Sequence, residues 1–280
     1  MPEHFHAHCG NHFISYGQST VYPPFPPRVM HAHENCEIFC IFRGNGYYIT
    51  EGTRHKFEHG KIFLMRSGES HRPDLIGEEP YFRLALHFDP SVVDGIDPER
   101  RLLRPFFDRP LGLHNVYDRS VVAQTGIYEL FRKMAILSGD KEKDCLHVTS
   151  LLFAVLDELC GLFDAGLFNA PTQSAALMHD VVAYVNENLT SQLSVEQICD
   201  KFYLSRGQLN RNFKNSTGAT LWDYVITKRL ILAKSCIADG MSAQEAARTC
   251  GFSDYSAFYR AYLKKHGTSP TGNSRLIDNG

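Results

Sequence analysis

The sequence predicts an α+β protein with two domains, the first built from short β-strands followed by two helices and the second entirely helical. Its 280 residues exceed the roughly 100 to 200 that are usual for one domain. The apolar residues change from a strand-like to a helical spacing, and a stretch rich in Gly, Pro, Asn and Ser surrounds Pro171, as is typical of a linker. We therefore expect a first domain over residues 1–165, a linker over 166–176 and a second domain over 177–272.

Composition and charge are those of an ordinary folded protein. Hydrophobic residues make up 43% of the chain and charged residues 21%, which excludes a disordered or fibrous protein. The net charge is -2, but after residue 176 the 12 Lys and Arg residues outnumber the 9 Asp and Glu residues. A mildly basic second domain is compatible with nucleic-acid binding, which depends on where the cations cluster.

The eight cysteines are scattered and form no C-x-x-C pair, so we expect all of them, Cys145 and Cys160 included, to be reduced thiols. The N-terminus lacks a basic segment followed by an apolar stretch, and no secretion signal is expected. No apolar run reaches the length of about 18 residues that a membrane span needs. These features predict a cytoplasmic protein without a membrane partner.

Short β-type runs lie between Val29 and Phe88, among them EIFCIF, GYYITE, KIFLM and FRLALHF, and turns containing Gly, Asn, Ser and Glu separate them. Such runs predict a small antiparallel barrel or sandwich. Between Ser120 and Phe163 the apolar residues recur every three or four positions, which predicts two helices. These helices could pack on the strands or form a dimer surface, and the spacing does not separate the two.

An internal repeat organises the second domain. Ser194 and Gln197 recur 48 residues later as Ser242 and Glu245, and after the following turn the offset becomes 49. A repeat of this kind means that one structural module is used twice. In each copy a Ser followed three positions later by Gln or Glu predicts a capping box at the start of a short helix. Each copy is therefore expected to be a helix-turn-helix unit.

The second helix of each unit is predicted to begin at an N-cap, Ser205 or Asp254, and to pack an apolar face inward. Its outward side chains suit DNA, because Arg matches guanine, Asn and Gln match adenine, and Lys holds phosphate. Two solvated helix faces are the alternative, which the repeated caps disfavour. The predicted DNA-binding residues are Arg206, Gln208, Asn210, Arg211, Lys214, Tyr255, Ser256, Tyr259, Arg260 and Lys264.

Over about residues 176–270 the sequence resembles the DNA-binding domain of AraC/XylS-type regulators. The second unit carries the most specific part of the pattern, in Ala247, Gly251, Phe252, Phe258, Tyr262, Gly267, Ser269 and Pro270. The resemblance implies a long helix, Leu221 to Ile237, that joins the units so that both recognition helices enter successive major grooves.

The same resemblance implies base-reading positions, at Gly207, Asn210, Arg211, Tyr255, Ser256, Tyr259 and Arg260. Gly207 has no side chain and lowers helix propensity by about 1 kcal/mol relative to Ala, so the first helix is expected to read less sequence than the second. The Arg that the family has near the end of the domain falls at Ser274, with Arg275 one place later.

In the first domain the spacing of His31, His33, Glu37 and His71, with nearby glycines, resembles the two cupin motifs over roughly residues 20–90, and implies a cupin-like β-barrel. Residues 31, 33 and 37 share one parity, so their side chains can lie on one face of a strand. Three imidazoles and a carboxylate suit a divalent transition metal such as Zn, Ni, Mn or Fe(II).

Regulators that resemble this chain often keep such polar residues to bind an organic effector without metal. Polar groups with aromatic walls suit a small, sugar-like molecule. The predicted effector-binding residues are His31, His33, Glu37, Tyr48, His71, Arg83 and His87. No cofactor is required by this interpretation, and the metal, with ligands His31, His33, Glu37 and His71, is the option it leaves open.

A further histidine cluster lies at the N-terminus, at His4, His6, His8, Cys9 and His12. Its spacing would allow chelation of a transition metal, but a mobile N-terminal arm is the favoured interpretation. In the family such arms can close over the effector pocket.

The predicted function is a sequence-specific DNA-binding transcription regulator, an activator and not an enzyme, controlled by a small-molecule effector. The resemblance also implies a homodimer and contact with RNA polymerase. Two alternatives use the first domain differently: a metal-dependent cupin enzyme, and a metal-sensing regulator.

Overall fold

The computed structural model describes residues 4–25, 30–169 and 173–270. The chain divides into two compact units, Met1–Ala175 and Ala176–Gly280. The predicted fold class is confirmed, because the first unit combines strands with trailing helices and the described part of the second unit is all helical. Helix α5 begins at Gln173, within the linker that the sequence predicted.

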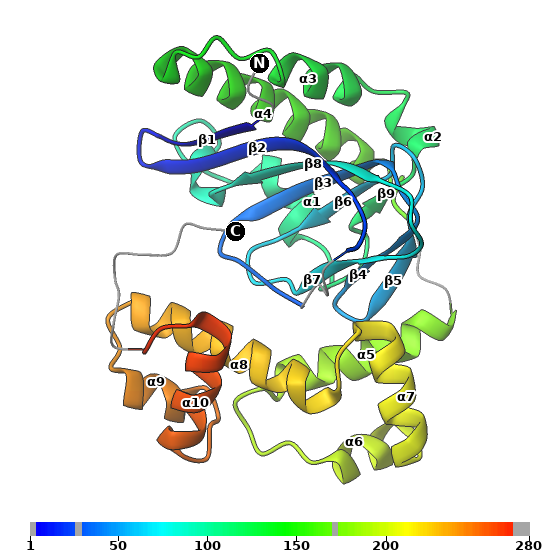
Figure 1. Cartoon of the computed structure of the whole chain (residues 1–280), viewed down its shortest axis with the longest axis vertical. Helices are drawn as coiled ribbons and strands as arrows, with labels where there is room; N and C mark the ends of the chain where they lie inside the picture. The colour runs from blue at the N-terminus through cyan, green and yellow to red at the C-terminus, as the bar shows by residue number, and fades with distance from the viewer. Residues whose placement is uncertain (1–3, 26–29, 170–172, 271–280) are drawn as a thin grey trace. The chain divides into compact units, whose positions relative to one another are not determined.

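The strands of the first unit form two antiparallel sheets instead of one closed barrel (Figure 1). The larger sheet has the order β1-β2-β8-β3-β6-β9, and the smaller has the order β5-β4-β7. A backbone bridge between His31 and His71 adds to the pairing outside the named strands. The strands are β1 (His4–Cys9), β2 (His12–Val21), β3 (Cys36–Arg43), β4 (Gly46–Thr50), β5 (Thr53–Lys56), β6 (Ile62–Met65), β7 (His71–Leu75), β8 (Tyr81–Phe88) and β9 (Val116–Tyr117).

Alternation along the strands gives the larger sheet two buried faces. In β3, Ile38 and Cys40 belong to a core shared with the helices, whereas Phe39 and Ile41 belong to a second core between the two sheets. This period of two is the geometric property of an extended chain. Both faces being apolar explains why EIFCIF lacks the alternation of a half-exposed strand.

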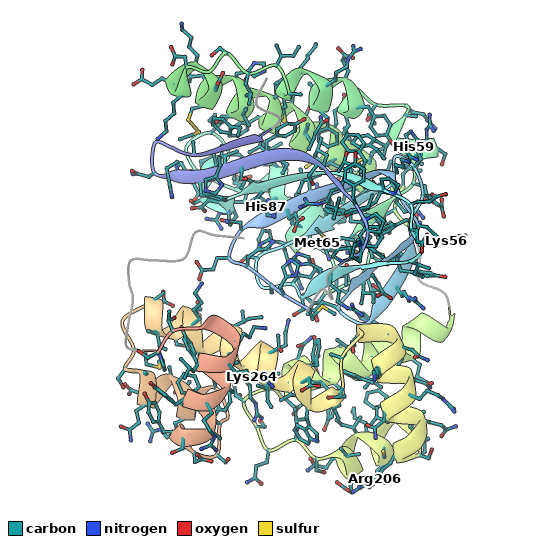
Figure 2. The ribbon with its side chains drawn as sticks, viewed as in Figure 1. Lys56, His59, Met65, His87, Arg206 and Lys264 are labelled. Atoms are coloured by element: carbon teal, nitrogen blue, oxygen red, sulfur yellow. A yellow bond between two sulfur atoms is a disulfide. The ribbon has the colours of Figure 1, made fainter. Side chains whose placement is uncertain are left out.

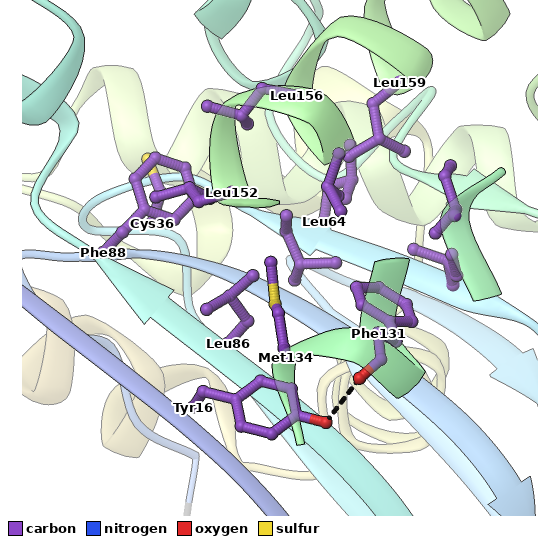
Figure 3. Close-up of a cluster of buried hydrophobic side chains, with 14 of the residues drawn as sticks. Tyr16, Cys36, Leu64, Leu86, Phe88, Phe131, Met134, Leu152, Leu156 and Leu159 are labelled. Atoms are coloured by element: carbon purple, nitrogen blue, oxygen red, sulfur yellow. Dashed lines mark hydrogen bonds between the residues drawn. The ribbon is translucent and has the colours of Figure 1, made fainter. Parts of the chain in front are cut away.

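Helices cover the outer face of the larger sheet. Figure 3 shows Leu152, Leu156 and Leu159 of helix α4 packed on this face, where the hydroxyl of Tyr16 donates to the carbonyl of Phe131 at 2.9 Å. Burying each such side chain contributes about 1.5–3 kcal/mol. The helical segments are η1 (Pro90–Val93), η2 (Arg101–Leu103), α1 (Arg104–Phe107), α2 (Arg119–Val122), α3 (Ile127–Met134) and α4 (Lys141–Asp164).

Among the described helices, α4 alone is long and apolar enough to cross a membrane, with a mean hydropathy of 1.6 over its most apolar window. Length and composition are weak evidence, because the core helix of a folded domain meets the same test. One side of α4, with Val148, Val155 and Leu162 among its buried residues, packs in the core against the sheet. The structure therefore uses this helix as a packing element of the first unit.

Two expectations about the N-terminal segment are wrong. Residues His4–Cys9 form an ordered edge strand paired with β2 from His4↔Gly17 to Cys9↔His12, not a mobile arm, because the side chains of Phe5 and Ala7 are buried in the helix-facing core. Cys9 is also not a reduced thiol, since it forms a disulfide with Cys145 of α4. The remaining six cysteines are free.

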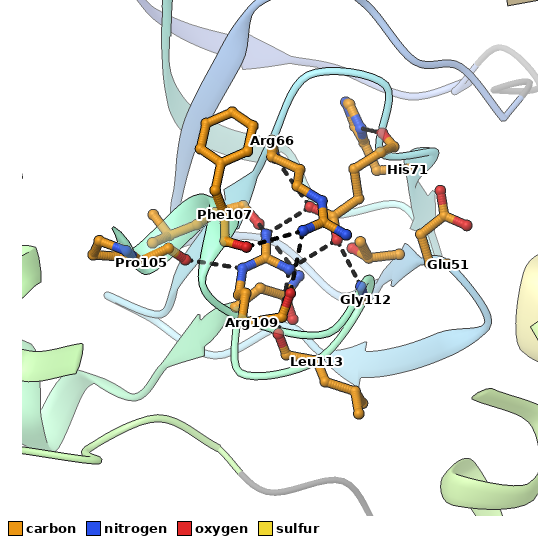
Figure 4. A network of polar contacts seen from close by, with 12 residues as sticks. Glu51, Arg66, His71, Pro105, Phe107, Arg109, Gly112 and Leu113 are labelled. Atoms are coloured by element: carbon orange, nitrogen blue, oxygen red, sulfur yellow. Dashed lines mark hydrogen bonds and ion pairs between the residues drawn. The ribbon is translucent and has the colours of Figure 1, made fainter. Parts of the chain in front are cut away.

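A fully buried ion pair fastens the turn between β6 and β7 to the loop after α1 (Figure 4). The guanidinium of Arg109 donates to both carboxylate oxygens of Glu69, at 2.9 and 2.6 Å, and to the carbonyls of Pro105 and Leu64. The backbone N–H of Gly112 also donates to Glu69, at 2.6 Å. Burial alone disfavours the carboxylate, but Arg109 beside it holds the pKa of Glu69 below its usual value.

Replacing Arg109 with Met should lower the free energy of unfolding of the first unit by about 3–5 kcal/mol, because the Glu69 carboxylate would stay buried without its partner. Urea unfolding followed by fluorescence measures the change. Arg100→Ala, which removes an exposed ion pair with Asp94, is the control. An equal loss in both variants would contradict the role given to burial.

The second unit is built from six helices in its described part, with two separate apolar cores. The first core joins α5, α6, α7 and the start of α8, and the second joins the rest of α8 to α9 and α10. The helices are α5 (Gln173–Glu187), α6 (Val195–Phe202), α7 (Arg206–Thr217), α8 (Leu221–Ala238), α9 (Ala243–Thr249) and α10 (Tyr255–His266). The predicted long helix is therefore confirmed as α8.

Candidate functional site

The two recognition helices, α7 and α10, begin and end in the same way. Ser205 accepts from the backbone N–H of Gln208 at the start of α7, and Asp254 accepts from that of Ala257 at the start of α10. Both helices stop at a glycine with a positive φ, 74° at Gly218 and 70° at Gly267, a conformation that glycine adopts without penalty. The predicted repeat is therefore present as two helices with equivalent boundaries.

The short helices that precede them also start at the predicted caps. Ser194 and Gln197 form a complete capping box at α6. At α9 the hydroxyl of Ser242 accepts from the N–H of Glu245 at 3.2 Å. The predicted helix-turn-helix plan is thus formed in both copies.

All ten predicted DNA-binding side chains are solvent-exposed, while Leu209, Phe213 and Phe258 are buried beneath them. Two of the ten form an ion pair or a hydrogen bond within the first helix-turn-helix copy. Arg206 forms an ion pair with Glu196 of α6, and the side-chain oxygen of Gln208 accepts from the N–H of Ser205 at 3.0 Å. Figure 2 shows Arg206 at the outer edge of the helical unit.

Arg229 of α8 connects the two helix-turn-helix units. Its guanidinium donates to the carbonyl oxygens of Leu189 at 2.7 Å and Ser191 at 2.9 Å, which precede α6, and to that of Gly251 at 2.6 Å, in the turn after α9. A planar fork with several donors suits three carbonyls at once. This role of Arg229 was not predicted from the sequence, although the Gly251-Phe252 turn is a signal of close approach.

The turn at Gly251 leaves little room for a side chain. Its φ is +84°, and a Cβ there would lie 3.0 Å from the carbonyl oxygen of Thr190 and from Cζ of Arg229. The equivalent position in the first helix-turn-helix copy is Tyr203, which has a φ of 54° and a side chain that is 95% exposed. A non-glycine residue in this region costs about 1–2 kcal/mol, so the two turns differ in backbone strain.

In the first unit a cluster of polar side chains surrounds Glu37, at the start of β3. The carboxylate oxygen Oε2 of Glu37 lies 3.0 Å from Nε2 of His33, 2.9 Å from Nε2 of His71 and 3.4 Å from Nε2 of His87. The four side chains come from β3, β7, β8 and the segment before β3. Glu37 and His71 are buried, whereas the side chains of His33 and His87 are 25% and 29% exposed.

Electrostatics stabilise the charged form of this cluster. Burial opposes ionisation of Glu37, but His87 and His71 nearby hold its pKa well below the usual value. Burial likewise disfavours a charged His71, yet the Glu37 carboxylate raises the pKa of His71 above its usual value. Tyr48 stacks on His71 with ring centroids 6.0 Å apart, and burial raises its pKa well above that of a free tyrosine.

The structure places the predicted effector residues unevenly. Glu37, His33, His71 and His87 converge, and Tyr48 packs behind them in the core between the sheets. Arg83 lies farther along β8, over the ring of Phe39 at 5.5 Å. His31 is exposed, and its ring lies against that of His71 with the ring centroids 4.4 Å apart.

Three of these residues could hold a metal ion, and they differ from the predicted set. The donor atoms of His33, Glu37 and His87 all lie within 4.8 Å of one another, so His87 takes the place that the prediction gave to His31 and His71. The carbonyl of Asn35 lies 2.8 Å from Nδ1 of His33, which directs Nε2 toward the cluster. Two ligands at about 2.0–2.1 Å from a tetrahedral ion stand roughly 3.3 Å apart, and Nε2 of His33 and of His87 lie 3.0 and 3.4 Å from Oε2 of Glu37, close to that spacing.

Two family models match the sequence. One, described as an AraC-like ligand binding domain, matches residues 24–156, and the other, described as a helix-turn-helix domain, matches residues 198–274. Their order and extent correspond to the sheets with their trailing helices and to the repeated helical unit. The chain belongs to the AraC family of regulators. The predicted family membership and the DNA-binding and ligand-binding domains of this AraC-family protein are therefore confirmed.

Known relatives agree with this assignment. The probable transcriptional regulator LumQ from Photobacterium leiognathi is 36% identical over 89 residues, which are 31% of this chain and 36% of LumQ. The transcriptional activator RhaR from Mannheimia succiniciproducens is 23% identical over 256 residues, which are 89% of this chain and 87% of RhaR. The chain thus spans about a third of LumQ and most of RhaR.

Among solved structures, ToxT from Vibrio cholerae O395 is 14% identical and aligns with a TM-score of 0.35, over 91% of this chain and 95% of ToxT.

The Arg229→Lys variant should bind DNA at least about tenfold more weakly, because an ammonium group cannot donate to three carbonyls in the geometry of a guanidinium. Fluorescence anisotropy with a bound genomic fragment measures the affinity, and circular dichroism reports whether the helices persist. Arg248→Lys, at an exposed position of α9, is the matched control. Unchanged affinity with intact helices would mean that the spacing of the two helix-turn-helix copies does not depend on Arg229.

Proposed function

We propose that this AraC-family protein is a transcription activator, not an enzyme, that binds double-stranded DNA with α7 and α10 and responds to a small organic effector in its first unit. The observation that carries the proposal is the repeated presentation of two recognition helices by equivalent caps. The relatives RhaR and RhaS are named as activators. Such a protein acts in the cytoplasm, as a homodimer that contacts RNA polymerase.

The DNA-facing chemistry is richer in α10 than in α7. In α10, Tyr259 and Arg260 are exposed, as is Lys264 one turn later. In α7, Arg206 is held by Glu196 and Gly207 offers no side chain, which leaves Asn210 and Arg211 to reach base edges. We infer that the second helix-turn-helix copy reads most of the DNA sequence and that the first copy mainly contacts the backbone of the DNA.

The effector is proposed to bind beside the polar cluster, on the inner faces of the strands, which are directed at the space between the two sheets. His33, His87 and Arg83 are partly exposed there. Ser19 lies opposite Arg83 in the pairing of β2 with β8, and its hydroxyl is buried without a hydrogen-bond partner. A buried polar group of this kind requires a partner, and a sugar-like molecule with several hydroxyl groups supplies one.

The homodimer is proposed to form through the outer surface of α3 and α4. Leu146 on α4 is 75% exposed, and Ile136 after α3 is 67% exposed. Large apolar side chains exposed on neighbouring helical elements are typical of an interaction surface. A dimer places two pairs of recognition helices on repeated DNA half-sites.

Arg260→Ala should cost about 1–3 kcal/mol of DNA binding and should relax the preference at one base pair, if the guanidinium contacts guanine. The operator is first identified by sequencing genomic fragments that the protein retains, and each base pair is then varied in an anisotropy assay. Lys264→Ala is the matched control, expected to weaken all sequences alike and to lower the salt slope by about one. Uniform loss for Arg260→Ala as well would make it a phosphate contact.

A metal-responsive regulator is the second candidate, favoured by the convergence of His33, Glu37 and His87. The partly exposed imidazoles allow an ion to enter, and the carboxylate supplies the negative charge that a divalent cation needs. In this case the ion would act as the effector, or would orient one, and no chemical reaction need follow.

His33→Ala and His87→Ala should each weaken binding of Zn²⁺ or Ni²⁺ by about 10-fold or more, because each removes one of three donors. His31→Ala should leave it unchanged, since His31 does not belong to the set. Equilibrium dialysis with metal analysis measures the stoichiometry. If the purified protein takes up no ion at micromolar concentration and still binds its operator, the effector is organic.

A further inference from the structure

The disulfide between Cys9 and Cys145 joins two elements that are distant in the sequence. Cys9 is the last residue of the edge strand β1, and Cys145 lies in the second turn of α4. Their Cα atoms are 5.4 Å apart across a sequence separation of 136 residues, which is within the usual range for a disulfide. Both residues are partly exposed.

The strand that this disulfide fastens has two different faces. Phe5, Ala7 and Cys9 face the helix-side core, and the intervening His6 and His8 point to the opposite face and are exposed. The polar cluster around Glu37 lies on that opposite face of the sheet. His6 pairs across from Ser15, Ser15 across from His87 and His87 across from Glu37, so these four residues form one row across neighbouring strands.

The attachment of β1 to the rest of the unit is limited. Among the described strands it pairs with β2 alone. It contacts α4 and the helix-side core through Phe5, Ala7 and Cys9, through the disulfide, and through the carbonyl oxygen of His8, which lies 3.9 Å from Sγ of Cys145. Removing the covalent bond would leave an edge strand free to open more often, because edge strands with few buried contacts have low local stability.

The compartment in which a DNA-binding regulator works is reducing, and disulfides that form there are usually transient and redox-sensing. We propose that Cys9 and Cys145 are a peroxide-responsive dithiol site. Its oxidation attaches β1 covalently to α4, and so fixes the position of His6 at the edge of the row that includes Glu37. This regulation rests on the function proposed for the polar cluster as the effector site.

The reaction balances with hydrogen peroxide as the oxidant. One thiolate attacks a peroxide oxygen, which gives a sulfenic acid and releases hydroxide. The second thiolate then attacks that sulfur and displaces a second hydroxide as the S–S bond forms. Two thiols and one peroxide thus give one disulfide and two waters, and a dithiol reductant reverses the step by thiol–disulfide exchange, becoming a disulfide itself.

Burial makes three of the other cysteines poor nucleophiles. Burial raises the pKa of the Cys36 thiol to about 12, and that of Cys160 also to about 12, which keeps both as unreactive thiols. Burial raises the pKa of Cys250 to about 12 as well, and Cys250 shares a hydrogen bond with Cys236. This second pair is close in space but not bonded, and it supplies a matched control within the chain.

The experiment uses the full chain, reduced with a phosphine and then treated with hydrogen peroxide. Peptide mapping without reductant should show one linked pair, Cys9 with Cys145, that dithiothreitol removes. Hydrogen exchange should slow by about tenfold or more at the amides of β1 on oxidation, and affinity for operator DNA should change at least about threefold. Cys9→Ser and Cys145→Ala should each abolish all three responses, while Cys236→Ser should leave them unchanged.

The outcomes separate this inference from the proposed function. Failure of the pair to link, or equal β1 exchange in both redox states, overturns the site while operator binding persists. A linked pair that alters β1 but leaves DNA affinity unchanged overturns its regulatory role. Absence of DNA binding in both redox states overturns the proposed function instead, and the linkage and exchange measurements then still decide whether the dithiol site exists.

Discussion

The guanidinium of Arg229 is the constraint on which the DNA-binding unit depends. The two helix-turn-helix copies have separate cores, one around Phe213 and one around Phe258, and only α8 belongs to both. A single helix between two small cores would transmit bending and rotation. The three carbonyls held by Arg229 tie the loop before α6 and the turn after α9 to the middle of that helix, so the separation of the recognition helices becomes a fixed property of the fold.

A comparable constraint acts in the first unit, where one strand serves three purposes. The even-numbered residues of β3 from Cys36 pack toward α4, and Phe39 and Ile41 fill the space between the sheets. Glu37 lies on the same face as Phe39 and Ile41 but at the beginning of the strand, where the packing ends and three imidazoles converge. The apolar residues therefore hold the carboxylate in place, because a shift of one residue would turn every side chain of β3 to the other face.

The local features of the fold could be predicted from the sequence. Ser194, Ser205 and Asp254 cap helices because their side-chain oxygens bond backbone groups within three residues, and such effects need no tertiary information. The members of the polar cluster were all among the predicted effector residues, but the predicted metal ligands did not include His87. The pairing of β8 with β3 places His87 opposite Glu37, and that register is set by contacts across fifty residues. The Cys9 disulfide was missed for the same reason, since it depends on where β1 lies against α4.

The turn at Tyr203 gives the two helix-turn-helix copies different mechanical characters. Where the second copy has a glycine that the left-handed backbone suits, the first holds an exposed aromatic residue in that conformation, followed by a recognition helix that contains Gly207. Both features lower the local stability of the first copy relative to its partner. We therefore expect the first copy to be the more flexible of the two on their shared helix, and to be the one that adapts to variation in DNA shape.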